Sequence, residues 1–138
     1  MNNIVAARTL IQQLTDVLED ASAITTDMRE FTDHFFAPGV YLRTLFIPKG
    51  HIVVGAIHKS ETINILLKGK ISVMDDQGGQ LIAQAPFIFT AKPGQKVGYA
   101  IEDVWYANIF PNTENIVNIK QLEDEHTVPS LDKLESLL

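Results

Sequence analysis

A histidine and a glutamate, His58 and Glu61, lie three residues apart at the entry to an apolar run that ends in Gly69. Imidazole nitrogens and carboxylate oxygens are both ligands for divalent metals, so this pair could begin a metal site. His51 does not extend the pair simply, because its odd spacing from His58 puts it on the opposite face of an unbroken strand. A bulge near Gly55 would change that. Two interpretations stay open, a local hydrogen-bonded pair and a metal site.

Aromatic and basic side chains form a second group of interest: Tyr41, Arg43, Tyr99 and Trp105. Aromatic faces and a guanidinium suit a carbohydrate or a nucleotide, so these residues could line a ligand pocket. The alternative is that they pack the interior and its edges. We predict no catalytic residue, because the chain has no G-x-S-x-G turn, no phosphate-binding glycine loop, no H-E-x-x-H and no cysteine.

Composition and charge limit the partners. The 138 residues carry a net charge of −6, whereas binding to nucleic acid or to an anionic membrane requires a basic surface. No apolar run approaches the roughly 18 residues that cross a bilayer. The N-terminus lacks the basic start and continuous apolar segment of a signal peptide, so we do not expect secretion by that route.

Residues 39–111 break into short apolar runs separated by turn signals, as expected of a β-sandwich or barrel. The clearest hairpin turn is the stretch DDQGGQ, where glycine supplies the positive φ that such turns need. No helical period interrupts these runs, so parallel strand–helix–strand units are not expected.

Alternation along two of the runs predicts which side chains share a face. In HIVVGAIH it groups three residues: Val54, Ala56 and His58. In TINILL it places three aliphatic residues opposite Asn64: Ile63, Ile65 and Leu67. We therefore expect Ile65 to lie in the core, together with Phe89 from a later run.

The two ends of the chain have a different pattern. Residues 1–36 are predicted to be helical, because apolar residues recur at spacings of three and four and form one stripe: Ile4, Ala7, Ile11, Leu14 and Leu18. Asp27 and Glu30 fit the capping box of a second short helix. Residues 114–138 hold six acids and two lysines, a charge of −4, and Ser130 suits the N-cap of a last short helix.

The segment GVYLRTLFIPKGHIVVGAIHKSETINILLKGKISV, followed by QAPFIFTAKPGQKVGYAIEDVWYANIFP, resembles the small cupin-like proteins encoded by tailed bacteriophages. The resemblance covers roughly residues 34–112. It implies a mainly β fold, the double-stranded β-helix or jelly roll of the cupins. The chain would then consist of an N-terminal helical arm (1–36), a jelly roll (37–112) and an acidic C-terminal tail with a short helix (113–138).

The resemblance also implies where a metal would bind. Metal-bearing cupins use an H-x-H pair, a glutamate a few residues later, and a histidine after a Pro-Gly turn. This chain has Ala56 and His58 at the paired histidines and Thr62 at the glutamate, with Glu61 one residue early. Val97 or a neighbour occupies the place of the last histidine. Only His58 and Glu61 remain as weak metal candidates, so no cofactor is expected, and a divalent metal is the alternative.

The cupin fold alone does not determine function, because it hosts enzymes, sugar-binding modules and storage proteins. The incomplete metal motif and the helical arm favour a non-catalytic structural or accessory protein of a bacteriophage, located in the virion or the host cytoplasm. We expect it to form a homo-oligomer through the arm and to contact other phage or host proteins. The alternative is a metal-dependent small-molecule cupin, either an enzyme or a binder of a sugar or small acid.

Overall fold

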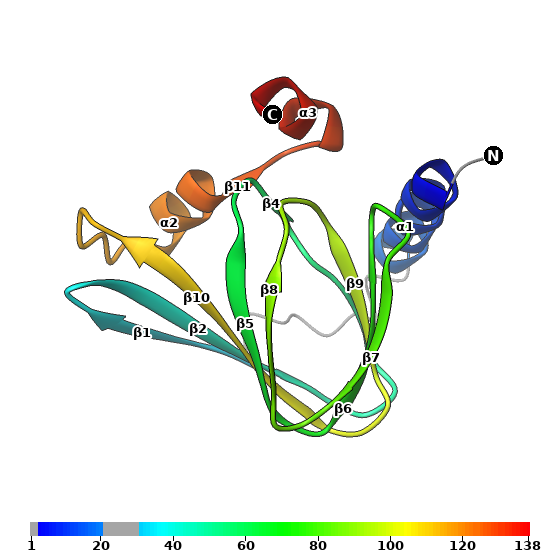
Figure 1. The fold of residues 1–138 in the computed structure, drawn as a ribbon, viewed down its shortest axis with the longest axis horizontal. Helices are drawn as coiled ribbons and strands as arrows, with labels where there is room; N and C mark the ends of the chain where they lie inside the picture. Colours follow the sequence, from blue (N-terminus) through cyan, green and yellow to red (C-terminus); the bar gives the residue numbers. More distant parts are fainter. Residues whose placement is uncertain (1–2, 21–30) are drawn as a thin grey trace.

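The computed structural model describes residues 3–20 and 31–138, which form two facing β-sheets with helices at both ends of the chain (Figure 1). Helix α1 spans Asn3–Asp20. The strands that follow are β1 (Thr32–Ala37), β2 (Gly39–Ile47), β3 (Ile52–Val54), β4 (Ile57–His58), β5 (Thr62–Lys68), β6 (Lys70–Asp75), β7 (Gln80–Gln84), β8 (Phe87–Ala91), β9 (Lys96–Ala100) and β10 (Val104–Asn112). The C-terminal elements are α2 (Ile119–His126), β11 (Thr127–Val128) and α3 (Leu131–Leu137).

The two sheets enclose the hydrophobic core. The larger sheet has the strand order β1-β2-β10-β5-β8, the smaller has the order β3-β9-β6-β7, and β4 pairs with β11. In Figure 1 the sheets converge at the lower end, and α2, β11 and α3 lie at the upper end. The prediction of a mainly β jelly roll with helices at both ends is confirmed. Seven side chains form the core cluster: Ile47, Leu66, Ile71, Val73, Ala83, Ala100 and Val104.

The residues of strand β5 that we predicted to face the core face outward, and the other set faces inward. Leu66 is fully buried and Asn64 is 2% exposed, whereas Ile65 is only half-buried. The register with β10 explains this, since Leu66 lies opposite Tyr106 and Asn64 lies opposite Asn108. The prediction that Ile65 belongs to the core is therefore wrong. Asn64 takes an inward position because the amide of Asn108 hydrogen-bonds to it.

Phe89 on β8, the other predicted core residue, lies opposite Asn64 and is half-buried. Its ring contacts the rings of Phe87 and Tyr106, with centroids 5.8 and 6.3 Å away. The next residue towards the chain start, Ile88, is 66% exposed. Phe89 therefore points inward as predicted, but it lies at the margin of the core.

A break between β3 and β4 shifts the alternation of HIVVGAIH. Gly55 lies in this break, and its N–H donates to the carbonyl of Lys96 at 2.9 Å. As a result Val53, one residue before Val54, packs against the core, while His58 lines a cavity between the sheets. The predicted grouping of Val54 with His58 is wrong, because the run is not one continuous strand.

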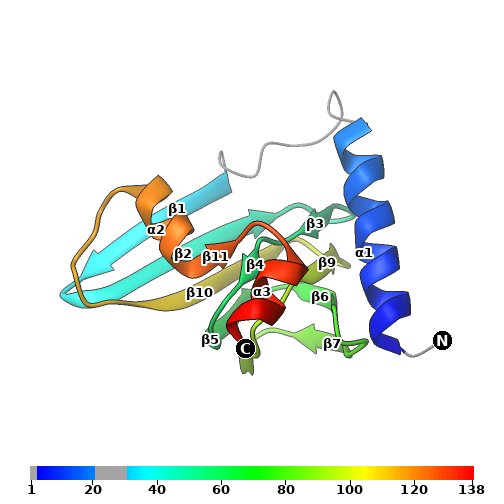
Figure 2. The same cartoon turned by 90° about the horizontal axis from the view of Figure 1, so that it is seen from above.

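Helix α1 lies beside β3 of the smaller sheet in its own chain (Figure 2). Ala7 is 5% exposed and Ile11 is 2% exposed, so the centre of the predicted apolar stripe is buried within the single chain. We predicted that the arm joins a second copy of the chain. These two side chains are not available for that contact. Asp27 and Glu30, the predicted capping box, lie outside the described residues.

Residues 32–37 form strand β1, so the prediction of helix up to residue 36 is wrong. The sequence TDHFFA is rich in aromatic residues, which favour a strand packed beside another strand. Strand β1 pairs with β2 across a tight turn, with Ala37 opposite Val40, and Gly39 in that turn has a φ of +77°. The Pro38-Gly39 pair therefore ends a strand, where the sequence had suggested the end of a helix.

The C-terminal segment crosses the upper end of the barrel in Figure 1. Strand β11 pairs with β4, and Thr127 lies opposite His58. Helix α3 is present as predicted, and the Ser130 hydroxyl caps it by accepting a hydrogen bond from the N–H of Lys133 at 3.1 Å. Of the helices in the described ranges, none is long and apolar enough to cross a membrane.

Arg8 connects the two ends of the described chain to the barrel. Its guanidinium forms ion pairs with Glu135 on α3 and, at 3.5 Å, with Asp76 in the turn between β6 and β7. Asp76 is 1% exposed and also accepts a hydrogen bond from the N–H of Gln95 at 3.0 Å. One arginine thus holds α1 and α3 against the same barrel turn.

Candidate functional site

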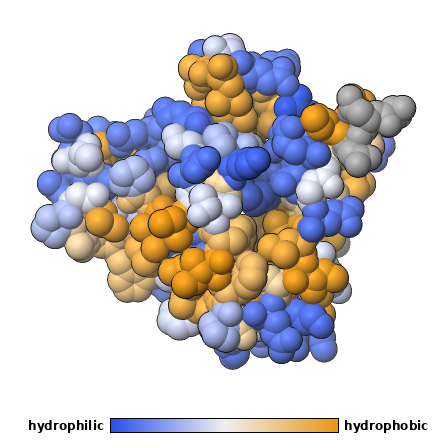
Figure 3. Space-filling model, in the orientation of Figure 1, coloured by the Kyte–Doolittle hydropathy of each residue, from blue (hydrophilic) through white to orange (hydrophobic). Residues whose placement is uncertain are grey.

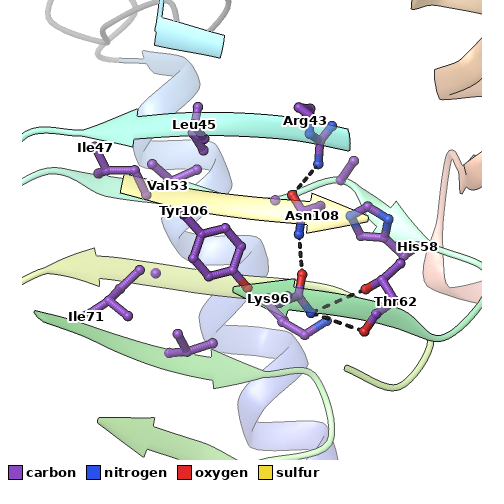
Figure 4. Close-up of a pocket in the computed structure, with 15 residues that line it drawn as sticks. Arg43, Leu45, Ile47, Val53, His58, Thr62, Ile71, Lys96, Tyr106 and Asn108 are labelled. Atoms are coloured by element: carbon purple, nitrogen blue, oxygen red, sulfur yellow. Dashed lines mark hydrogen bonds between the residues drawn. The ribbon is translucent and has the colours of Figure 1, made fainter. Parts of the chain in front are cut away.

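A cavity of about 110 Å³ lies between the two sheets, and its wall divides into a polar and an aliphatic part (Figure 4). The polar side chains come from five strands of both sheets: Arg43, His58, Thr62, Asn64, Lys96 and Asn108. Four aliphatic side chains lie at the other end in Figure 4: Leu45, Ile47, Val53 and Ile71. Val73 also lines the cavity. Tyr106 lies between the two parts in Figure 4.

A chain of hydrogen bonds crosses the polar wall. Arg43 donates to the Asn108 carbonyl oxygen at 3.0 Å, and the Asn108 amide donates in turn to Asn64. The Asn64 amide lies 3.3 Å from the hydroxyl of Thr62. The strand register produces this arrangement, since Arg43, Asn108 and Asn64 are direct neighbours across β2, β10 and β5.

Two cations face this cavity without a carboxylate partner. Burial lowers the pKa of Arg43 and also that of Lys96, whose pKa the nearby Asp75 and Asp76 act to raise. No acidic side chain lines the cavity, and within the described ranges neither cation forms an ion pair. Glu123 acts on Arg43, as Asp75 and Asp76 act on Lys96, but without forming an ion pair. A largely buried charge that lacks a direct ion pair is costly, so an anion in this cavity would be stabilised.

His58 completes the polar wall as a neutral imidazole. Its ring stacks on Phe110 with centroids 5.6 Å apart, and its buried Nδ1 atom has no hydrogen-bond partner. Burial, followed by the charges of Arg43, Lys96 and His126, lowers the pKa of His58 to about 4. At neutral pH the ring is therefore uncharged.

Glu61 does not join His58 in this cavity. Glu61 is exposed, and it lines a separate surface hollow beside Ile63 and Pro111. Among the hydrogen bonds of the described residues, none connects Glu61 to His58. The sequence pair that suggested a site therefore separates into one residue inside the barrel and one outside it.

The four residues predicted to line a ligand pocket do not lie together. Arg43 lines the main cavity, and Tyr41 lines an adjoining cavity of about 100 Å³ that shares Arg43 and His58 with it. Tyr99 and Trp105 are each 44% exposed. They lie on the outer faces of β9 and β10, because the residue next to each of them faces the cavity.

Three polar residues of the cavity were not predicted from the sequence: Asn64, Lys96 and Asn108. Asn64 and Asn108 each interrupt an otherwise apolar strand, TINILL and VWYANIF, and a lone polar residue in such a run is a usable signal. Lys96 follows the Pro93-Gly94 turn, next to the Val97 position that the cupin resemblance singled out.

The donor set does not fit a divalent metal. Ala56, His58 and Thr62, at the positions that carry metal ligands in metal-bearing cupins, line the cavity together with Lys96. Only His58 is an ordinary metal ligand, and a lysine ammonium in the same space repels a cation. Across residues 3–20 and 31–138, no group of three His, Cys, Asp or Glu residues is placed to hold a metal ion.

We expect the free energy of unfolding to fall between pH 6.5 and about 4 because of His58. Its pKa is about 4 in the folded protein against 6.5 ordinarily, so between these values the unfolded chain binds the additional proton. This contribution is complete above pH 6.5, is lost as the pH falls to about 4, and corresponds to about 3 kcal/mol.

Urea denaturation at neutral pH and near pH 4, on the wild type and on His58→Gln, measures this effect. The variant should lose most of the pH dependence that His58 causes in this range. An identical pH dependence in the wild type and His58→Gln would show that His58 is not held neutral by the fold.

No family model and no curated protein matches this sequence. Similarity is found at the level of structure. Protein NMB1881 from Neisseria meningitidis superposes with a TM-score of 0.52 at 10% identity, covering 69% of this chain and 96% of that one. An RmlC-like cupin from Shewanella frigidimarina gives a TM-score of 0.51 at 15% identity, covering 64% of this chain and 78% of that one.

A larger enzyme contains the same fold. Salicylate 1,2-dioxygenase from Pseudoaminobacter salicylatoxidans gives a TM-score of 0.53 at 14% identity, covering 76% of this chain and 31% of the enzyme. At such identities the likeness establishes the fold and nothing about substrates. The fold predicted from the sequence, a cupin jelly roll, is thereby confirmed.

Proposed function

We propose that this protein binds a small carboxylic acid inside its barrel, without a metal and without catalysing a reaction on it. One observation carries the proposal: Arg43 and Lys96, both largely buried, face a cavity whose wall contains no acidic side chain. A bound carboxylate would supply a direct counter-charge, since Glu123, Asp75 and Asp76 act on these cations without forming an ion pair. The guanidinium of Arg43 has the fork geometry that carboxylates accept.

The cavity also indicates the size of the acid. Its volume of about 110 Å³ equals the space of roughly four water molecules in the liquid. The carboxylate would lie near Arg43, Lys96 and His58, with a short hydrocarbon tail against the aliphatic end. A short aliphatic acid such as butyrate has this shape, whereas a nucleotide or an oligosaccharide exceeds the cavity.

Isothermal titration with butyrate, compared with the uncharged butyramide, tests this function. We expect the wild type to bind the acid and not the amide. Replacing Arg43 with glutamine should weaken butyrate binding by about tenfold to a hundredfold, the loss of one charge-assisted hydrogen bond. Lys68→Gln, a change of an exposed lysine outside the cavity, should leave the affinity unchanged.

Equal binding of butyrate and butyramide would show that charge is not recognised. Full binding by Arg43→Gln together with full binding by Lys96→Gln would contradict the assignment of the site. Circular dichroism of each variant separates a loss of affinity from a loss of fold.

We also propose that the protein serves a bacteriophage as a structural or accessory component that self-associates and contacts phage or host proteins, in the virion or the host cytoplasm. The resemblance of residues 34–112 to phage cupin-like proteins supports this role. An extensive apolar outer face on the larger sheet favours protein contact. Mass spectrometry of purified particles distinguishes the two locations, and a bacterial chromosomal origin without phage genes nearby would contradict the proposal.

A further inference from the structure

Tyr106 lies at the boundary between the polar and the aliphatic part of the main cavity. It is half-buried on β10, opposite Leu45 on β2 and Leu66 on β5, and it packs against the core cluster. Asn108, two residues further along β10, faces the same side of the strand and belongs to the polar part. The Tyr106 hydroxyl points from this boundary towards the polar part, where Lys96 lies (Figure 4).

This hydroxyl is free to bond a ligand. Among the hydrogen bonds of the described residues, none involves the Tyr106 hydroxyl. Three side-chain atoms in the described part of the chain are fully buried and lack a hydrogen-bond partner: Arg8 Nε, His58 Nδ1 and His126 Nε2. The Tyr106 oxygen is not one of them, so it borders open space in the cavity. The same holds for the ammonium of Lys96.

The charges around the Tyr106 hydroxyl favour an oxygen atom of the ligand at this place. Burial, against the charge of Arg43, raises the pKa of Tyr106, so the hydroxyl keeps its proton at neutral pH and can donate it. The Lys96 ammonium can only donate. A ligand atom between these groups must therefore accept hydrogen bonds, as a hydroxyl or carbonyl oxygen does. An ammonium group of a ligand would be repelled by both cations.

The oxygen would lie next to the carboxylate of the acid. Arg43, which would hold the carboxylate, donates to Asn108, and Asn108 is the next inward residue after Tyr106 on β10. Because the hydrocarbon tail lies at the aliphatic end, the carbon next to the carboxylate passes Tyr106 at the boundary. One additional oxygen takes up less than the volume of one water molecule, and the cavity of about 110 Å³ has room for it.

The surface around the polar part of the cavity is hydrophilic as well. The polar part lies towards the end of the barrel that the C-terminal segment crosses, since His58 pairs with Thr127 of β11. Figure 3 shows mostly hydrophilic side chains over this upper end, and hydrophobic ones over the region where β5 and β8 lie in Figure 1. The molecule is thus polar, inside and outside the barrel, at the end where the polar groups of the acid would lie.

We propose that the acid bound in the barrel is a short 2-hydroxy or 2-oxo acid, and that Tyr106 selects it by bonding the oxygen on the carbon next to the carboxylate. This inference rests on the proposed function, because it requires a carboxylate near Arg43. It adds the class of acid and a residue that distinguishes this class from unsubstituted acids and from amino acids.

Isothermal titration with butyrate, 2-hydroxybutyrate and 2-aminobutyrate tests the selection, because the three acids share one carbon skeleton. We expect the wild type to bind the tighter enantiomer of 2-hydroxybutyrate about tenfold more tightly than butyrate, the gain from one hydrogen bond. 2-Aminobutyrate should bind more weakly than butyrate. Tyr106→Phe removes only the hydroxyl and should reduce the preference for 2-hydroxybutyrate over butyrate to less than about twofold. Tyr99→Phe is the matched control and should keep the preference, because Tyr99 is 44% exposed on the outer face of β9.

The outcomes separate this inference from the function on which it rests. If neither butyrate nor 2-hydroxybutyrate binds, the proposed function is wrong and the inference falls with it. If the wild type binds the two acids equally, or if the preference persists in Tyr106→Phe, the function stands and the inference is wrong. Tighter binding of 2-aminobutyrate than of 2-hydroxybutyrate would reject an acceptor oxygen as the recognised group.

Discussion

Replacing Gly69 with alanine should lower the free energy of unfolding by about 4 kcal/mol. Gly69 has a φ of +88°, and a Cβ atom there would lie 2.0 Å from the carbonyl oxygen of Asp103. A non-glycine residue in the left-handed region costs about 1–2 kcal/mol. The overlap adds to this cost, because the atoms that this Cβ would meet all belong to the backbone. No side-chain rotation can therefore relieve the overlap. The turn after β5 and the start of β10 would have to move apart.

Gly50→Ala is the matched control. Gly50 has nearly the same conformation, with a φ of +85°, but a Cβ there would meet nothing within 4 Å. Its substitution should therefore cost only about 1–2 kcal/mol, the conformational part. Urea denaturation of both variants measures the difference, and equal losses would show that Asp103 does not approach Gly69 so closely.

Replacing Leu66 with alanine should destabilise the protein by about 3–4 kcal/mol, through lost burial and the cavity that remains. Leu66 is fully buried in the core cluster, while its neighbour Leu67 is 41% exposed on the opposite side of the strand. Leu67→Ala should therefore cost less than about 1 kcal/mol. Urea denaturation of both variants measures the difference. A larger loss for Leu67→Ala would restore the strand orientation that the sequence suggested.

The strands and turns of the barrel were predictable, but the orientation of β5 was not. Apolar runs and turn signals located the strands of residues 39–111 because each strand is short and bounded by glycine or proline. Alternation assigns the more apolar side to the core. On β5 the inward side carries Thr62, Asn64 and Leu66, and the outward side is entirely aliphatic. The rule therefore gives the wrong orientation for a strand whose outer face is apolar.

The candidate site was predictable only in part. Arg43 and His58 could be named because an arginine and a histidine near apolar strands are unusual and suggest chemistry. Lys96, Asn64 and Asn108 were missed because distant parts of the chain bring them together. Asn64 and Asn108 meet through the register of β5 and β10, and Lys96 faces the same cavity from β9 of the other sheet. The break at Gly55, which turns His58 into the cavity, depends on a hydrogen bond to the distant Lys96 carbonyl.

The central position of β10 has a consequence for synthesis of the chain. Strand β10 lies between β2 and β5, yet it is the last strand of the larger sheet to leave the ribosome. The 56 residues 48–103 lie between the end of β2 at Ile47 and the start of β10 at Val104, and they take about 3–11 s to translate at typical rates. During that interval the β1–β2 hairpin, and the β5–β8 pair once it has emerged, exist without the strand that joins them. The nascent chain therefore exposes two unpaired sheet edges and is vulnerable to aggregation until residue 112 has emerged.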